Sequence, residues 1–484
     1  MAIHPAARCR SEPAIRMVKV TFRENPCIDM EEDVMEQQIM QPQTNAGAAQ
    51  EQRHPIAIEA IDLVKDYGHG ENAVHALRGV NVRFEQGRFT AIMGPSGSGK
   101  STLMHTLAGL DSATSGHIVF DGADITTMND NQLTMLRRHK IGFIFQSFNL
   151  LPMFTAEQNI LMPLTLAGQK PDRQWFDMLT TTLGLKERLT HRPNELSGGQ
   201  QQRVAIARTL APEPSVLFMD EPLSNLDAKL RLEMRYELQR LHVETGSTFV
   251  YVTHDQMEAM TLATQICLIN NGVLQQYQPP LTVYNHPQNL FVADFVGNPS
   301  INFVEAKGAQ QPDGSITLDI LGGVKAVFRP REGLDLAAWF AERDRKAAAH
   351  AAERLAKSQE KGYVEKGNKD EPFRYHIAKV EEEDDSLQEE PILTNEDLVL
   401  GIRPEFLNIT SEAPLKGEIY GAMPTGMEST IKVYVNEFLL TGVVFGSSLF
   451  TIGEQHSISF TGHHIMLFDR QSGDCIALGS LETL

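Results

Sequence analysis

One run of the sequence has the residue types and spacing that bind phosphate groups. The run reads Gly94-Pro95-Ser96-Gly97-Ser98-Gly99-Lys100-Ser101-Thr102. Its glycines let backbone N–H groups face an anion, and the start of a following helix adds partial positive charge. Lys100 can reach the β- and γ-phosphates of a nucleotide, and the Ser101 hydroxyl can bind Mg²⁺. A glycine-rich turn without a ligand is the alternative, but the match to G-x-x-x-x-G-K-[ST] is complete, so we expect a phosphate-binding loop.

A second candidate anion site follows later in the chain. Ser197, Gly198, Gly199 and Gln200 precede apolar residues with helical spacing that reach Leu210. A serine and two glycines in the first turn of a helix can hold an anion with their backbone N–H groups. The same residues also form ordinary helix caps, so this segment alone does not distinguish a ligand site from a cap.

Two carboxylates follow the apolar residues 216–219, which predict a buried strand. Asp220 is placed to hold Mg²⁺, directly or through water. Glu221 is placed to polarise an attacking water as a general base. Paired acids can also form a solvated turn, but after a complete phosphate-binding loop we expect them to serve hydrolysis.

Two further predicted strands end in polar side chains. Gln146 follows the apolar residues 141–145, and His254 comes shortly after residues 248–252. In open α/β sheets, strand ends beside a nucleotide carry groups that contact the ligand. Gln146 can sense the nucleotide there, and His254 can contact the γ-phosphate. The alternatives are a solvent-exposed cap for the glutamine and a structural role for the histidine.

The elements that must position these side chains alternate between strand and helix. Apolar residues 89–93 precede the phosphate-binding loop and helical residues 103–107 follow it, which is the order that the motif needs. Residues 56–64 alternate as a strand does, and residues 147–192 have a mostly helical pattern. The expected fold class is therefore α/β.

The composition argues against some classes of function. The chain of 484 residues carries a formal net charge of −19 without a basic stripe, which argues against nucleic-acid binding. Its 4 cysteines are scattered, which favours a reducing compartment and no structural metal. No apolar run is long enough to cross a bilayer, and no hydrophobic signal core follows Met1. We therefore expect a cytoplasmic protein that reaches any membrane through partners.

In this order, the motifs resemble those of the ATP-binding subunits of ABC transporters, over about residues 56–302. The matching positions are the phosphate-binding loop at 94–102, the Q-loop Gln146, the signature at 196–200, the Walker B run at 216–220 with Glu221, the D-loop at 224–227 and the switch His254. The resemblance implies a P-loop NTPase core of ABC type with a helical signature subdomain. It implies ATP and Mg²⁺ as cofactors, with Ser101, Gln146 and Asp220 at the metal. It also implies that Tyr67 stacks on the base of ATP.

The same resemblance implies an assembly. Two copies would form a head-to-tail dimer in which each ATP lies between the phosphate-binding loop of one chain and residues 197–200 of the other. The helical subdomain between Gln146 and Leu196 would contact ABC permease subunits at the cytoplasmic face of the cell membrane. An extracytoplasmic solute-binding protein would act on the permease, and so only indirectly on this chain.

Different parts of the chain resemble different branches of the family. Up to about Leu210, runs such as residues 145–152 resemble lipoprotein-release and macrolide-efflux ATPases. From Leu217 onward, residues 219–231 and 251–260 resemble sugar-import ATPases. Efflux-type chains usually stop soon after the switch histidine, whereas this chain runs on. We therefore expect a subunit that powers import of sugars or related solutes, with efflux or lipoprotein release as the alternative.

Two further interpretations involve neither import nor efflux or lipoprotein release. A soluble ABC ATPase of translation or DNA repair usually carries two ATPase cores or a long coiled-coil insertion, and this sequence has one core and no sustained heptads. A recombined reading frame, whose halves serve no single transporter, is the other alternative. The motifs are complete across the join, so ATPase chemistry would survive in that case as well.

Three parts are expected along the chain. Residues 1–54 are expected to be a disordered tail, because they lack a sustained period. Residues 55–297 would form the ATPase domain. Residues 298–484 would form an OB-like regulatory β-barrel of the sugar-importer kind. A charged helical insertion at about 335–395 interrupts this barrel; it is most simply a solvated surface element, and a protein-docking element is the alternative.

Overall fold

The computed structural model of the chain describes residues 55–68, 73–358, 373, 375–379, 393–410, 412–446 and 448–484. The predicted tail at 1–54 and much of the second half of the predicted insertion, including its acidic run, lie outside these residues. Across the part of the chain that the structure describes, no helix combines the length and apolar character that crossing a membrane requires.

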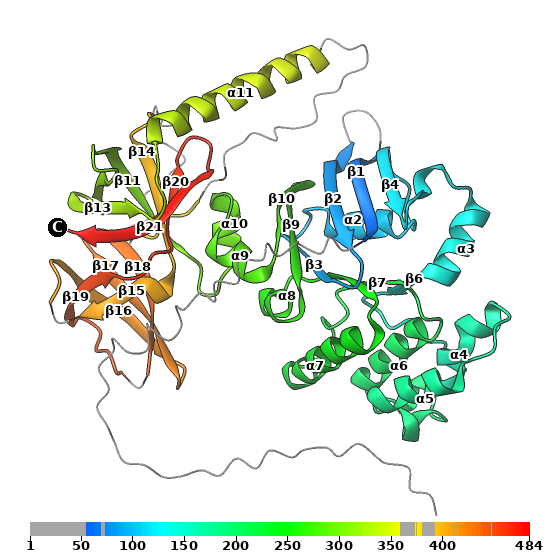
Figure 1. Ribbon diagram of the computed structural model, residues 1–484. Helices are drawn as coiled ribbons and strands as arrows, with labels where there is room; N and C mark the ends of the chain where they lie inside the picture. The colour runs from blue at the N-terminus through cyan, green and yellow to red at the C-terminus, as the bar shows by residue number, and fades with distance from the viewer. Residues whose placement is uncertain are drawn as a thin grey trace, which may run out of the picture. The chain divides into compact units, whose positions relative to one another are not determined.

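A six-stranded sheet organises the α/β part of the chain (Figure 1). Its order is β10-β9-β3-β8-β7-β6, and all neighbours run parallel except β10, which is antiparallel to β9. The strands are β3 (Phe89–Met93), β6 (Ile141–Ile144), β7 (Val216–Asp220), β8 (Thr248–Val252), β9 (Gln265–Asn270) and β10 (Val273–Gln278). β3 and β8 are buried along their whole length, as expected for parallel strands that are covered on both faces.

One face of this sheet packs against α2 and a second sheet. Helix α2 (Lys100–Leu107) contributes Leu103, Met104 and Leu107 to a core shared by both sheets. The second sheet is antiparallel in the order β2-β1-β4-β5. Its strands are β1 (Ile56–Tyr67), β2 (Val74–Glu85), β4 (Ser115–Phe120) and β5 (Ala123–Asp124).

The opposite face packs against helices. Apolar side chains of α4, α5, α6 and α7 share a core with β6, β7 and β8. Of these helices, α4 and α5 lie between Gln146 and Leu196, where the sequence predicts a helical subdomain. The α/β helices are α3 (Asp130–Lys140), α4 (Ala156–Leu166), α5 (Arg173–Thr182), α6 (Gly198–Leu210), α7 (Ala228–Thr245), α8 (Gln256–Leu262), α9 (Pro280–Asn285) and α10 (Leu290–Phe295). Short 3₁₀ turns are η2 (Ile125–Thr127), η3 (Lys186–Arg188), η4 (Pro193–Glu195) and η6 (Pro404–Phe406).

The C-terminal part contains a closed barrel of the order β11-β12-β13-β21-β20-β14, whose described neighbours pair antiparallel. Its strands are β11 (Asn302–Gln310), β12 (Ile316–Ile320), β13 (Val324–Pro330), β14 (Asp397–Ile402), β20 (Ile465–Asp469) and β21 (Cys475–Thr483). The α/β fold class and the C-terminal barrel that the sequence predicted are thus confirmed.

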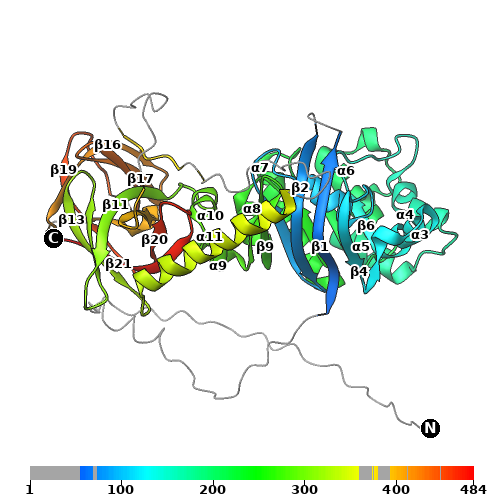
Figure 2. The same ribbon diagram turned by 90° about the horizontal axis from the view of Figure 1, so that it is seen from above.

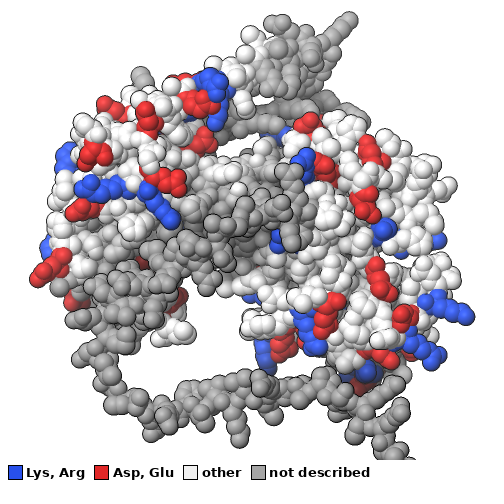
Figure 3. Space-filling model, viewed as in Figure 1, with Lys and Arg blue, Asp and Glu red and all other residues white. Residues whose placement is uncertain are grey.

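A separate five-stranded sheet was not predicted from the sequence. Its order is β15-β19-β16-β17-β18, with β15 (Leu407–Thr410), β16 (Leu415–Pro424), β17 (Glu428–Val435), β18 (Phe438–Phe445) and β19 (Gln455–Phe460). Between β13 and β14, α11 (Leu336–Ser358) forms one uninterrupted helix (Figure 2). This helix lies within the predicted insertion, and its first turns pack Leu336 and Phe340 against the core of the C-terminal part. On the face shown in Figure 3, acidic and basic side chains are interspersed.

A buried arginine, Arg403, helps to join the barrel region to the α/β part. Arg403 is 1% exposed. Its guanidinium donates to the carbonyls of Ala293 and Val296 at the end of α10, and to the Tyr284 carbonyl of α9 at 2.9 Å. The group also lies 4.1 Å from the centroid of the Tyr284 ring, a cation–π contact. Burial lowers the pKa of Arg403, so the hydrogen bonds must offset the desolvation of its charge.

We expect Arg403→Met to destabilise the protein strongly. The substitution leaves three carbonyls without their donor, and unpaired buried acceptors cost about 1–3 kcal/mol each, so the free energy of unfolding should fall by about 3 kcal/mol or more. Urea denaturation followed by circular dichroism measures this change. Arg345→Met is the control, because Arg345 is an exposed residue of α11 whose partner among the described residues is Glu342 of the same helix, and it should change little. Equal stability of the two variants would contradict this role of Arg403.

Candidate functional site

The loop at residues 94–102 connects β3 to α2, and two of its glycines are required by close backbone contacts. A Cβ on Gly94 would lie 2.0 Å from the Ile269 carbonyl oxygen, and one on Gly99 would lie 2.4 Å from the Ala76 carbonyl oxygen. Gly99, with φ 100°, is also the N-cap of α2. Gly97 has φ 78° and nothing within 4 Å of its Cβ position. The loop is therefore fixed at both ends, and its middle faces open space.

Lys100 is folded back over this loop. Its ammonium donates to the carbonyls of Gly94 at 3.0 Å and Pro95 at 2.8 Å, and the residue is 8% exposed. Burial lowers the pKa of Lys100, while Glu221 and Asp220 act in the opposite direction. A buried cation with neutral carbonyl acceptors gains by bonding to anionic phosphate oxygens, because charge-assisted bonds are the stronger ones.

Ser101 and Asp220 meet beside the loop. The Ser101 hydroxyl donates to Asp220 Oδ1 at 3.1 Å. A hydroxyl and a carboxylate oxygen in contact are the donors that Mg²⁺ prefers, so these residues fit a magnesium site. His105 Nε2 lies 3.5 Å from Asp220 Oδ2. The sequence analysis missed His105, although its spacing from Ser101 on a predicted helix places both on one face.

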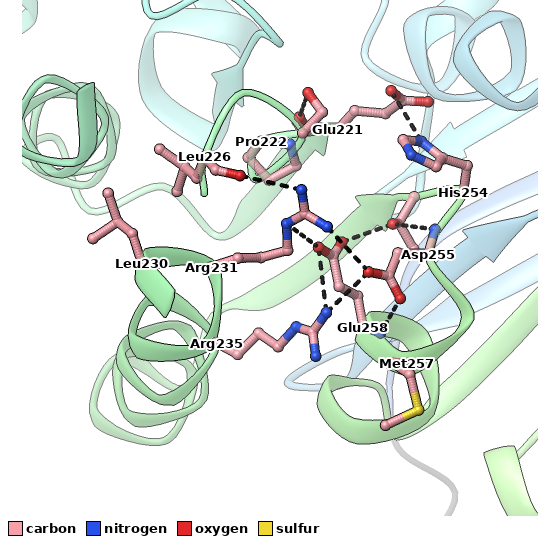
Figure 4. Close-up of polar contacts among 12 residues, drawn as sticks. Glu221, Pro222, Leu226, Leu230, Arg231, Arg235, His254, Asp255, Met257 and Glu258 are labelled. Atoms are coloured by element: carbon pink, nitrogen blue, oxygen red, sulfur yellow. Dashed lines mark hydrogen bonds and ion pairs between the residues drawn. The ribbon is translucent and has the colours of Figure 1, made fainter. Parts of the chain in front are cut away.

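Glu221 follows β7 in a strained conformation and faces His254 (Figure 4). Its φ is 44°, in the left-handed region that costs an ordinary residue about 1–3 kcal/mol and clusters at functional sites. Its N–H donates to the Val252 carbonyl at 3.0 Å, which joins the end of β7 to β8. His254 Nδ1 lies 3.3 Å from Glu221 Oε2. The His254 side chain is 63% exposed and that of Glu221 is 23% exposed, so both are accessible to water and ligand.

Gln146 contacts the D-loop. Its Nε2 donates to Ser224 Oγ at 3.4 Å, and Asn225 Nδ2 donates to its backbone carbonyl at 3.0 Å. The Ser224 hydroxyl in turn donates to the Glu221 carbonyl at 2.9 Å. A chain of hydrogen bonds thus connects Gln146 with the backbone of Glu221. Among the described residues, no hydrogen bond joins Gln146 to Ser101 or Asp220.

Ser197 begins α6 and makes its hydrogen bonds within the first turn. Its hydroxyl accepts from Gln200 N–H at 3.4 Å, and its own N–H donates to Gln200 Oε1 at 3.0 Å. This is the capping box that the sequence analysis left open as an alternative. Ser197 and Gly198 are exposed, while Gly199 packs against Leu230 of α7. Within the described chain, no hydrogen bond connects residues 197–200 to the phosphate-binding loop.

Tyr67 is the last residue of β1, and it lies near Thr102 at the end of the loop at residues 94–102. Its hydroxyl donates to Asp111 Oδ2 at 2.6 Å, and Lys65 Nζ lies 4.8 Å from the ring centroid. Burial raises the pKa of Tyr67, the Asp111 hydrogen bond adds to the rise, and a hydrogen bond with Thr102 opposes it. The residue is 41% exposed, so part of the ring remains accessible beside the loop.

Comparisons with known proteins agree on one family. The family described as ABC transporter matches residues 77–224. The chain is 41% identical over 259 residues to the lactose transport ATP-binding protein LacK of Rhizobium radiobacter, covering 53% of this chain and 69% of that protein. It is 42% identical over 258 residues to the maltose/maltodextrin import ATP-binding protein MalK of Yersinia pestis, covering 53% and 68%.

A solved dimeric bacterial ABC transporter cassette is 38% identical, covering 46% of this chain and 98% of that chain with a TM-score of 0.43. The loop at 94–102, its buried Lys100, and Asp220 and Glu221 at the end of β7 lie inside the region matched by the family. From the family match and the two relatives, we conclude that this chain belongs to the ABC transporter family of ATP-binding proteins, which hydrolyse ATP to power transport.

Proposed function

We propose that this chain is the ATP-hydrolysing subunit of an importer for sugars or related solutes. The observation that carries the proposal is the convergence of five side chains at one edge of the parallel sheet. Lys100 and Ser101 come from the start of α2, Asp220 ends β7, and His254 faces Glu221 at 3.3 Å. These are the groups needed to bind phosphate, hold a metal and activate water.

Nucleotide binding is assigned to the loop and to Tyr67. Residues 94–102 would surround the phosphates with backbone N–H groups, and Lys100 would move from its loop carbonyls to phosphate oxygens. Tyr67 would stack on the base with the exposed part of its ring. Its contact with Thr102 supports this placement, because Thr102 ends the loop.

The metal and the hydrolytic step are assigned to the polar groups at the strand ends. Ser101 and Asp220 would hold Mg²⁺, with Gln146 as the third proposed position; the ion would offset negative charge on the phosphates. Glu221 would orient and deprotonate the attacking water, and His254 would contact the γ-phosphate. The hydrogen bonds from Gln146 through Ser224 to Glu221 give Gln146 a path by which to sense the nucleotide.

A dimer of two copies completes the proposed site. Ser197, Gly198, Gly199 and Gln200 begin α6, and the exposure of Ser197 and Gly198 leaves this helix start open to a phosphate. No hydrogen bond among the described residues brings this segment to the loop of its own chain. The simplest assembly is head-to-tail, with residues 197–200 of each chain facing the phosphate-binding loop of the other.

The direction of transport is inferred from the relatives and the C-terminal part. The names of the two relatives refer to lactose transport and maltose/maltodextrin import. The barrel after residue 297 lies beyond the region in which efflux-type chains usually stop, which favours import over efflux or lipoprotein release. The partners would be ABC permease subunits at the cytoplasmic face of the membrane, together with an extracytoplasmic solute-binding protein that acts through them.

Glu221→Gln should separate ATP binding from hydrolysis. The amide cannot take a proton from water, so turnover should fall about a hundredfold or more, while nucleotide affinity stays near that of the unmodified protein. Lys100→Ala is the contrasting variant, because it removes a phosphate contact and should weaken nucleotide binding itself. Binding of a fluorescent ATP analogue and release of phosphate are the two measurements. Near-normal turnover by Glu221→Gln would rule out its proposed role.

Capture from membranes tests the direction of transport. We expect the Glu221→Gln protein, held with ATP in detergent-solubilised host membranes, to co-purify with two multi-spanning permease subunits and a solute-binding protein. Mass spectrometry identifies these partners, and Lys100→Ala serves as the control that does not form the ATP-bound state. A single four-span permease with a large outer domain would instead favour efflux or lipoprotein release.

A further inference from the structure

Two arginines of α7 face two carboxylates around the start of α8, and we call these four residues the ionic cluster (Figure 4). Arg235 lies 3.0 Å from Asp255 and 3.8 Å from Glu258. Arg231 lies 3.6 Å from the same Asp255 oxygen and 3.9 Å from the same Glu258 oxygen. The cluster is charge-balanced. The Glu258 side chain is 5% exposed and that of Arg235 is 17% exposed, so the contacts are largely shielded from water.

The cluster is anchored to the D-loop on one side. Arg231 donates to the Leu226 carbonyl at 3.1 Å. Leu226 belongs to the D-loop, whose Ser224 donates to the Glu221 carbonyl. Movement of Arg231 would therefore be transmitted to the backbone next to Glu221.

On the other side, the cluster is anchored on both flanks of His254. Glu258 Oε2 accepts hydrogen bonds from Tyr251 at 2.6 Å and from Thr253 at 2.7 Å. Asp255 directly follows His254, caps α8 through the Glu258 N–H and accepts from Arg235. His254 is exposed and contacts Glu221, and its two chain neighbours, Thr253 and Asp255, are both bonded within the cluster.

We propose that the ionic cluster is a positioning device that holds His254 against Glu221, by locking α7 to the segment between β8 and α8. The proposal rests on the hydrolytic role proposed for these two residues. Helix α8 has only 7 residues and gains little stability by itself, so it depends on such tertiary contacts. A displacement of about 1 Å at a reacting group can cost about a hundredfold in rate, so the exact length of these contacts matters for turnover.

A purely structural role for the ionic cluster predicts a different experimental result. Removing one partner of a buried ion pair leaves the other charge uncompensated and lowers stability. A cluster that serves only stability would therefore show its loss in Arg235→Met as a lower melting temperature, without a selective loss of turnover. A positioning cluster would lose turnover while nucleotide binding remains, because the phosphate contacts of Lys100 and the loop lie on other elements.

The test compares variants of the full-length chain. Arg235→Met should lower the kcat of ATP hydrolysis by about tenfold or more, with KM changed by less than about twofold. Arg235→Lys keeps the charge and should recover most of the activity. Arg240→Met is the matched control, because Arg240 lies on the same helix and pairs with Glu244 at 2.8 Å on the exposed side. It should leave kcat unchanged.

A double variant tests whether the effect passes through His254. If it does, Arg235→Met added to His254→Ala should lower the residual turnover no further, as measured by slow release of radiolabelled phosphate. Additive losses would overturn the proposal, as would an Arg235→Met protein whose kcat is within twofold of the unmodified chain.

Folding and the hydrolytic assignment are checked separately. Thermal denaturation identifies a misfolded Arg235→Met protein. If Arg235→Met is misfolded, a double variant that combines Arg235→Met with Glu258→Gln is used in its place in all measurements. This double variant removes one charge of each sign. Normal turnover by Glu221→Gln would contradict the proposed function itself. Loss of turnover by Glu221→Gln together with normal turnover by Arg235→Met would contradict only the role of the cluster.

Discussion

The parallel pairing of β3, β8 and β7 is the constraint on which the candidate site depends. The register sets Ile92 opposite Val252, and Val252 opposite Asp220. Each chain segment therefore leaves the sheet at the same edge, within a few residues of Gly94, His254 and Glu221. All three strands are buried on both faces, so a shift of one residue would exchange side chains between two packed cores. The same strand register thus determines both the packing of the core and the geometry of the site.

Contacts at the edge of the sheet also hold the backbone of Glu221 in its strained left-handed conformation. A left-handed glutamate persists only where its surroundings determine it. Here its N–H is bonded to the Val252 carbonyl and its carbonyl accepts from the Ser224 hydroxyl. The residue is therefore held from two directions, by the neighbouring strand and by the turn that leads into α7. The ionic cluster adds a third link between that turn and the segment carrying His254.

The C-terminal part is tied to the α/β part and to itself through buried polar side chains. Arg403 bonds to the ends of two helices of the α/β part. Asn302 joins the two β structures, because its amide donates to the carbonyls of Ile402 and Thr441 and its oxygen accepts from Thr441 N–H. Satisfied polar groups in such places specify one arrangement more strictly than apolar contacts do.

The sequence by itself determined the local features. Strand, loop and helix around Lys100 follow from neighbouring residues, since glycine content and hydrophobic period are read within one short window. The helical cap at Ser197 and the barrel strands are predictable for the same reason. Only the tertiary structure decided which distant groups meet. Ser101 and Asp220 are 119 positions apart, and their contact depends on strand order that local pattern does not encode. The ionic cluster and the five-stranded sheet were missed for that reason, because alternation predicts strands but leaves their partners open.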